Sequence, residues 1–163
     1  MKVIVAGLFR PTEPSLARLA LVFGLAAVAV EAVALVFLYV PLAVIESGES
    51  LAALNGTPAL IYLATRLFAA GFAFSLLLFA GFCVLIGVLI VRSRLVPLAI
   101  GAMMIVAGIC YVVNTLAMIV SPGFFELINP TILLPILLAE LSLALWLLLK
   151  GIAVETKQDE RSA

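Results

Sequence analysis

The sequence predicts an all-α fold, an integral membrane four-helix bundle with both termini in the cytoplasm, and three observations support this prediction. Hydrophobic residues make up 66% of the 163 positions and charged residues only 11%, whereas soluble domains have about 45–50% apolar and about 25% charged residues. The apolar residues form four long runs. Nearly all basic residues lie on one side of those runs, which gives the helices an orientation.

Each apolar run is long enough to cross a bilayer. An α-helix rises about 1.5 Å per residue and the hydrocarbon core is about 30 Å thick, so about 20 residues suffice. We therefore expect spans at about 15–45, 58–91, 95–120 and 131–150. These spans form a transmembrane domain, 15–151, which follows a cytoplasmic N-terminal stub, 1–14, and precedes a cytoplasmic polar tail, 152–163. The polar, mixed-charge composition of the tail predicts disorder.

Residues within the runs predict how the helices bend and pack. Pro41 in the first run and Pro135 in the fourth interrupt the helical hydrogen-bond ladder, so we expect a kink about one turn before each. Small residues would let neighbouring helices approach closely. The glycines of this kind are Gly71, Gly81, Gly87, Gly101 and Gly108. This pattern predicts a packed bundle and not four separate spans.

The basic residues orient the predicted helices. Eight of the nine lie on one side: Lys2, Arg10, Arg18, Arg92, Arg94, Lys150, Lys157 and Arg161. The loops on the other side carry Glu46, Glu49 and Glu126 and no basic residue. The positive-inside rule therefore places both termini in the cytoplasm. We expect the protein to lie in the inner (plasma) membrane.

The ninth basic residue, Arg66, is predicted to lie at the outer membrane interface. It is 26 residues from Arg92, or about 39 Å along an ideal helix. At that depth its side chain can snorkel to water or phosphate, or it can meet one of the acidic residues of the outer loops.

The composition excludes several classes of enzyme. The chain has no histidine, which is the usual ligand of haem b and zinc and the usual proton relay near neutral pH. Its lysines, Lys2, Lys150 and Lys157, all lie near the chain ends, so none is available for a Schiff base in the membrane. We expect a protein that is not an enzyme, with no catalytic residue, no metal site and no nucleic-acid partner; the sequence identifies no cofactor.

A few polar residues lie within the predicted spans. Glu31 is about 20 Å of helix from Arg18, and Glu140 is about 15 Å from Lys150, so both carboxyls lie near the bilayer midplane. An ionised carboxylate there costs a few kcal/mol, so each should be protonated, hydrogen-bonded or hydrated. Their candidate partners are Asn114, Tyr111 and Ser75, of which Tyr111 and Ser75 lie at about middle depth. Such a cluster can serve proton-coupled binding or transport of a small solute, or it can pack helices together.

Several segments resemble a known family. They are Gly71 to Ser75, Gly87 to Ser93, Leu95 to Pro97, Ala107 to Tyr111 and Glu140 to Gly151. On these segments the chain is similar to a bacterial family of multi-pass membrane proteins, domain of unknown function 4386. The most specific similarity is in the last helix, at Glu140, Trp146, Lys150 and Gly151. The resemblance implies that this chain is a short, four-helix form lacking the first helix pair of longer members, and it implies no reaction.

Two functional interpretations remain open. The first is a non-enzymatic membrane protein that self-associates or serves as a structural or accessory subunit, with a homo-oligomer or other membrane protein subunits as partners. The second is a proton-linked carrier or binding protein for a small solute or lipid, which uses the buried carboxyl of Glu140. The bilayer is a partner in both, and bound lipid, quinone or pigment is compatible with either because such ligands leave little sequence signature.

Overall fold

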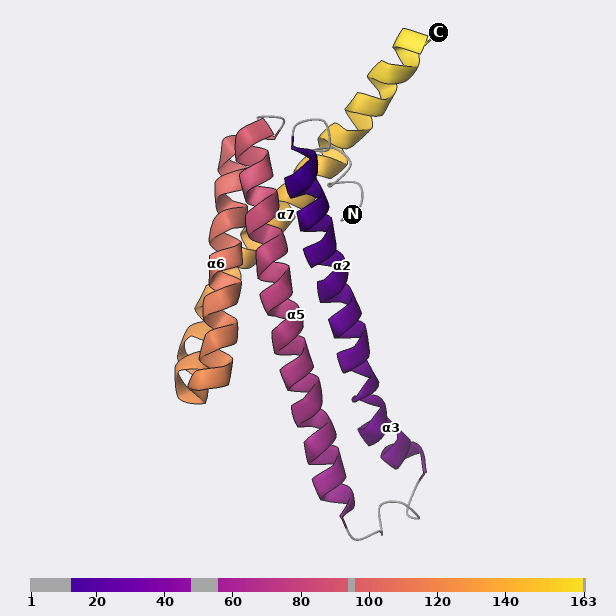
Figure 1. Ribbon diagram of the computed structural model, residues 1–163, viewed down its shortest axis with the longest axis vertical. Helices are drawn as coiled ribbons and strands as arrows, with labels where there is room; N and C mark the ends of the chain where they lie inside the picture. The colour runs from indigo at the N-terminus through magenta and orange to yellow at the C-terminus, as the bar shows by residue number, and fades with distance from the viewer. Residues whose placement is uncertain (1–12, 48–55, 94–95, 163) are drawn as a thin grey trace.

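The computed structural model describes residues 13–47, 56–93 and 96–162 (Figure 1). The regular structure of these residues is helical: α2 (Pro14–Val36), α3 (Tyr39–Glu46), α5 (Thr57–Ser93), α6 (Leu98–Val120) and α7 (Pro122–Ser162). Most of the predicted N-terminal stub, together with Glu49 and Arg94, lies outside the described residues.

The membrane prediction is confirmed at the level of the helices. Within the described part of the chain, four stretches are long and apolar enough to span a bilayer: Pro14–Glu46, Thr57–Ser93, Leu98–Val120 and Gly123–Lys150. The second and third begin and end within three residues of the predicted bounds. The protein is therefore an all-α chain with four candidate membrane helices.

The first span is interrupted between α2 and α3, as Pro41 predicts. The N–H of Phe37 bonds to the carbonyl of Ala34 at 3.1 Å, and the N–H of Leu38 bonds to that of Leu35 at 3.0 Å, so the helix tightens into a turn there. Pro41 has no N–H to donate to the carbonyl of Phe37, and its ring crowds that carbonyl. The chain then resumes as α3.

The predicted start of the fourth span is wrong. The sequence indicates a loop up to about residue 131, but α7 begins at Pro122, and only Ser121 separates it from α6. The N–H of Ser121 closes α6 on Ala117 at 2.9 Å, and its carbonyl accepts the first bond of α7, from Phe125, at 3.0 Å. Proline suits the first position of a helix, where its missing N–H has no partner to lose. Glu126 consequently lies within α7 and not in a loop.

The helix α7 is also longer at its other end than expected. It runs through Pro135 without a break, and its helix continues through the predicted polar tail to Ser162. The tail contains no glycine or proline after Gly151, and Glu, Lys, Gln and Arg all have good helix propensity. In Figure 1 this last part of α7 extends beyond the ends of the other helices.

The helices pack in chain order, with α5 between α2 and α6, and α7 against α6 (Figure 1). Close approach of α5 and α6 depends on glycine. A Cβ atom at Gly87 would lie 2.7 Å from the carbonyl oxygen of Gly101, and one at Gly108 would lie 2.9 Å from that of Ala80. The predicted packing through small residues is thus present between these helices.

The buried core lies toward one end of the molecule, where α2 begins and α5 ends. It consists of Ala17, Ala20, Phe82, Cys83, Ile86, Leu89, Ile90, Val96, Met104, Ala107, Ile136, Ala139 and Leu143. Because Arg18, Arg92 and Lys150 lie at this end, we call it the basic end. The opposite end, where Glu46 ends α3, is the acidic end. Figure 1 shows α3 and α5 continuing past the α6–α7 turn at the acidic end.

One ion pair joins two helices at the basic end. Arg92 Nη1 lies 2.7 Å from Glu13 Oε1, which links the end of α5 to the residue that precedes α2. The side chains are 55% and 37% exposed, so water screens the pair and its contribution to stability is below about 1 kcal/mol.

Candidate functional site

The structure brings together two of the predicted intramembrane residues, Tyr111 of α6 and Glu140 of α7. The hydroxyl of Tyr111 donates a hydrogen bond to Glu140 Oε1 at 2.7 Å, and both residues are half-buried. A bond of this kind satisfies a carboxyl group that water cannot reach. This pair is the polar contact between helices that the sequence places near the middle of the bilayer.

Aromatic rings of α5 hold the tyrosine in place. The edge of one ring of the Phe79–Tyr111 pair meets the face of the other, with centroids 5.4 Å apart and planes at 79°. Phe79 in turn stacks on Phe82 at 5.5 Å. Edge-to-face contacts of this type are worth about 0.5–1.5 kcal/mol beyond their buried area. Through the ring of Tyr111, the Tyr111–Glu140 pair of α6 and α7 therefore also contacts α5.

Ser75 is buried but does not join this pair. Its hydroxyl donates to the carbonyl of Phe72, three residues earlier in α5, at 2.9 Å. Serine commonly satisfies itself in this way inside a helix. The sequence places Ser75 at the correct depth but cannot reveal that its hydrogen bond is local.

Asn114 is buried in α6, only 6% exposed, and does not contact Glu140 through a hydrogen bond. Its Oδ1 and the Oγ1 of its neighbour Thr115, which is 1% exposed, have no hydrogen-bond partner among the described residues. Leaving such atoms unpaired costs about 1–3 kcal/mol each. Sequence reasoning missed Thr115; its only signal is a second polar residue beside Asn114 in an apolar span.

Glu31 is not brought to the Tyr111–Glu140 pair either. It lies one turn from Ala27 and one turn from Ala34, which are both buried, and Ala34 faces Gly71 of α5. Glu31 itself is exposed. Among the described residues, no hydrogen bond or ion pair satisfies its carboxyl group. In the part of the chain that the structure describes, Glu31 is therefore an acidic residue on an exposed side of α2 with no polar partner.

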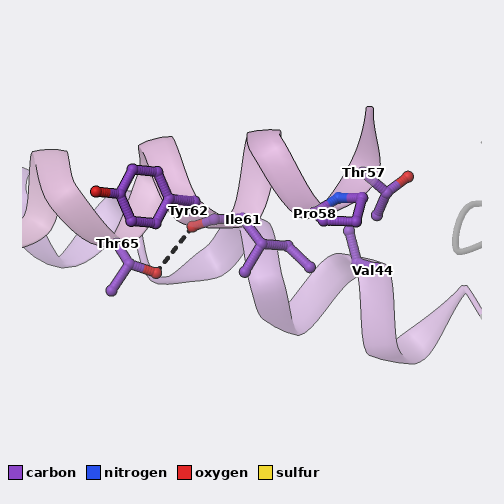
Figure 2. A pocket seen from close by; sticks show the side chains of 6 residues that line it. All are labelled: Val44, Thr57, Pro58, Ile61, Tyr62 and Thr65. Carbon is purple, nitrogen blue, oxygen red and sulfur yellow. Dashed lines mark hydrogen bonds between the residues drawn. The ribbon is translucent and has the colours of Figure 1, made fainter. Parts of the chain in front are cut away.

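Arg66 lies beside a pocket at the acidic end. Its Cζ atom is 5.9 Å from the centroid of the Tyr62 ring, one turn earlier in α5. Tyr62 lines a pocket of about 570 Å³ between the end of α3 and the start of α5. Figure 2 shows the side chains that line it: Val44, Thr57, Pro58, Ile61, Tyr62 and Thr65. The Thr65 hydroxyl donates to the carbonyl of Ile61 at 2.8 Å, which leaves its lone pairs available.

Sequence reasoning did not find this pocket. Val44 and Ile61 line it from opposite sides, and they lie on two helices separated by a segment whose path the sequence does not give. The lining residues belong to α3 and to the first turns of α5. The sequence indicates only that Arg66, a cation, and Tyr62, an aromatic residue, lie at the membrane interface in this region.

Comparison with known proteins gives a family but no characterised relative. No curated protein and no solved structure matches the chain. The model of the family described as "Domain of unknown function (DUF4386)" matches residues 1–151, which include all four candidate membrane helices. The chain therefore belongs to the DUF4386 family.

Proposed function

We propose that this chain is a non-enzymatic membrane protein that acts within an assembly, most simply by associating with further copies of itself. The observation that carries the proposal is the exposed carboxyl of Glu31 on α2. In this proposal the basic end faces the cytoplasm of a bacterium, because Arg18, Arg92 and Lys150 gather there and the positive-inside rule applies.

The position of Glu31 makes an isolated chain in lipid unfavourable. It is 13 residues from Arg18, about 20 Å along α2 and hence near the middle of the bilayer. The neighbouring exposed side chains of α2 are apolar, among them Val28 and Leu35. Placing an acidic side chain in lipid there costs at least about 3 kcal/mol. A polar group from outside the chain would remove that cost.

A second copy can supply that group. Two copies related by a two-fold axis along α2 bring one Glu31 to the other, and two carboxyls can share a single proton. The exposed residues one turn from Glu31 on the same face of α2, Val28 and Leu35, are apolar, so a second α2 can pack against them while its own Glu31 meets the first. Association through this face would bury the acid without any change in the contacts of α5, α6 and α7.

Single-molecule photobleaching of the labelled protein in liposomes at high dilution tests this proposal. We expect wild-type protein and Glu31→Gln, which keeps a hydrogen-bonding group, to bleach in more than one step. We expect Glu31→Leu to bleach mainly in one step, and Val28→Ala, one turn away on α2, to behave as wild type. Single-step bleaching of the wild type, or unchanged association of Glu31→Leu, would contradict the proposal.

A second candidate function is favoured by the Tyr111–Glu140 hydrogen bond. A carboxyl held by one tyrosine hydroxyl at 2.7 Å retains further acceptor capacity. A small solute or lipid with a hydrogen-bond donor can compete for it, and protonation of the carboxyl would then be coupled to binding. In this role the protein is a proton-linked carrier or binding protein.

Two substitutions separate this role from a structural one. If Glu140 binds a solute, Glu140→Gln abolishes proton-linked flux or ligand affinity in a protein that still folds. Tyr111→Phe should keep the carboxyl and alter the affinity less. A Glu140→Gln protein that folds and retains the full flux excludes the carrier role, and one that does not fold marks the carboxyl as structural.

A further inference from the structure

The pocket at the acidic end combines three properties that belong to one kind of ligand. It is mainly apolar, three of its lining residues (Thr57, Tyr62 and Thr65) carry a hydroxyl group, and it adjoins the cation of Arg66 through the Tyr62 ring. Its volume of about 570 Å³ falls within the range of about 300–1,000 Å³ that is usual for small-molecule sites.

Arg66 lies at the depth of a phosphate layer. It is 26 residues from Arg92 in the same helix, about 39 Å, and a bilayer with its headgroups is about 40–45 Å thick. If Arg92 lies in the headgroup layer at the basic end, Arg66 lies in the layer at the acidic end. Arg66 is exposed and no ion pair joins it to an acidic residue in the described part of the chain. Its guanidinium is therefore available to an anion, and phosphate is the anion of that layer.

The order of groups along α5 matches the order of groups in a phospholipid. The pocket with its hydroxyls lies outermost, at Thr57 to Thr65, and Arg66 follows. The next turns toward the bilayer centre carry Phe68 and Phe72, whose rings stack at 5.9 Å and are half-buried. A headgroup, a phosphate and an acyl chain occur in the same sequence from the surface inward.

We propose that this site binds a phospholipid from the leaflet at the acidic end. The phosphate pairs with the Arg66 guanidinium, the headgroup enters the pocket between α3 and α5, and one acyl chain lies along Phe68 and Phe72. The site is complete within one chain, so it does not depend on self-association or on Glu31.

Native mass spectrometry of the protein from mild detergent, with added phosphatidylglycerol, diacylglycerol or inorganic phosphate, tests this assignment. We expect wild-type protein to retain one phosphatidylglycerol and to bind diacylglycerol, which lacks the phosphate, far more weakly. Loss of a charge-assisted hydrogen bond should lower the affinity of Arg66→Gln for phosphatidylglycerol by at least about tenfold. Arg18→Gln, an exposed cation at the other end, is the matched control and should retain the lipid.

A second variant tests the pocket separately from the charge. Thr65→Trp fills the pocket and leaves Arg66 in place, so it should also release the lipid while the protein still unfolds at the wild-type detergent concentration. Equal retention by Arg66→Gln and wild type would overturn the proposal, as would lipid retention by Thr65→Trp. Binding of inorganic phosphate as tight as that of phosphatidylglycerol would overturn it in favour of a free-phosphate site.

Discussion

Replacing Gly87 with alanine should weaken the contact between α5 and α6, where backbone atoms of the two helices lie close together. An added Cβ atom would lie 2.6 Å from Ile105 Cγ1, 2.7 Å from the Gly101 carbonyl oxygen and 2.9 Å from the Ile105 backbone nitrogen. The Ile105 side chain can rotate away, but the two backbone atoms cannot move unless the helices separate. Gly123→Ala is the matched control, because no atom lies within 4 Å of its added Cβ.

The expected magnitude follows from two opposing effects. Overpacking a tight contact costs about 1–3 kcal/mol, and two backbone clashes place Gly87 at the upper end of that range. Alanine has a helix propensity about 1 kcal/mol better than glycine, which offsets part of the cost. The net loss in the free energy of unfolding should be about 2 kcal/mol, or about 30-fold in the unfolding equilibrium. Gly123→Ala should gain at most about 1 kcal/mol.

Reversible unfolding in mixed micelles with increasing sodium dodecyl sulfate measures both variants against wild type. The reasoning predicts that Gly87→Ala unfolds at lower detergent fraction and that Gly123→Ala does not. If Gly87→Ala is as stable as wild type, α5 and α6 do not approach as closely as described.

The same unfolding assay checks three further substitutions. Tyr111→Phe removes the bond to Glu140 and should cost about 0.6–1.7 kcal/mol; a stabilised variant would show that the bond does not form. Thr115→Val replaces a buried unpaired hydroxyl by a methyl group and should stabilise the protein by about 1 kcal/mol, whereas a loss of stability would reveal a partner for that hydroxyl. Arg92→Gln breaks the exposed ion pair with Glu13 and should change the free energy of unfolding by less than about 1 kcal/mol. A larger loss would show that the ion pair is shielded from water.

Much of this fold could be predicted from the sequence, because lipid requires long apolar helices and tolerates few polar residues. The four spans follow from length and rise per residue, and the break before Pro41 follows from the missing N–H of proline. The start of α7 at Pro122 could not be predicted in this way, because the composition of the following residues is compatible with a loop or a helix. The hydrogen bonds at Ser121, which end α6 and begin α7, decide between the two. The helix after Gly151 agrees with the good helix propensity of Glu, Lys, Gln and Arg. The prediction of disorder considered only the polar composition of that segment.

The candidate site was predicted less completely, because depth does not specify direction. The sequence predicts Glu31, Glu140 and Ser75 near the middle of the bilayer, with Asn114 as a further candidate partner, yet of these residues only Glu140 accepts a hydrogen bond from Tyr111. Whether a side chain turns toward a neighbouring helix depends on the rotation of each helix about its axis. The rotation is set by contacts such as the one between Gly71 and Ala34, which a single sequence does not reveal.

The central claim is that the protein acts in an assembly that covers the open face of α2. Native mass spectrometry of the wild-type chain, extracted from its own membrane in a mild detergent, tests this claim most directly. We predict a particle whose mass is that of two or more copies of the 17.2 kDa chain. A fixed complex with other polypeptides would retain the assembly but replace self-association by an accessory role. A 17.2 kDa monomer that co-purifies with no protein would contradict the account.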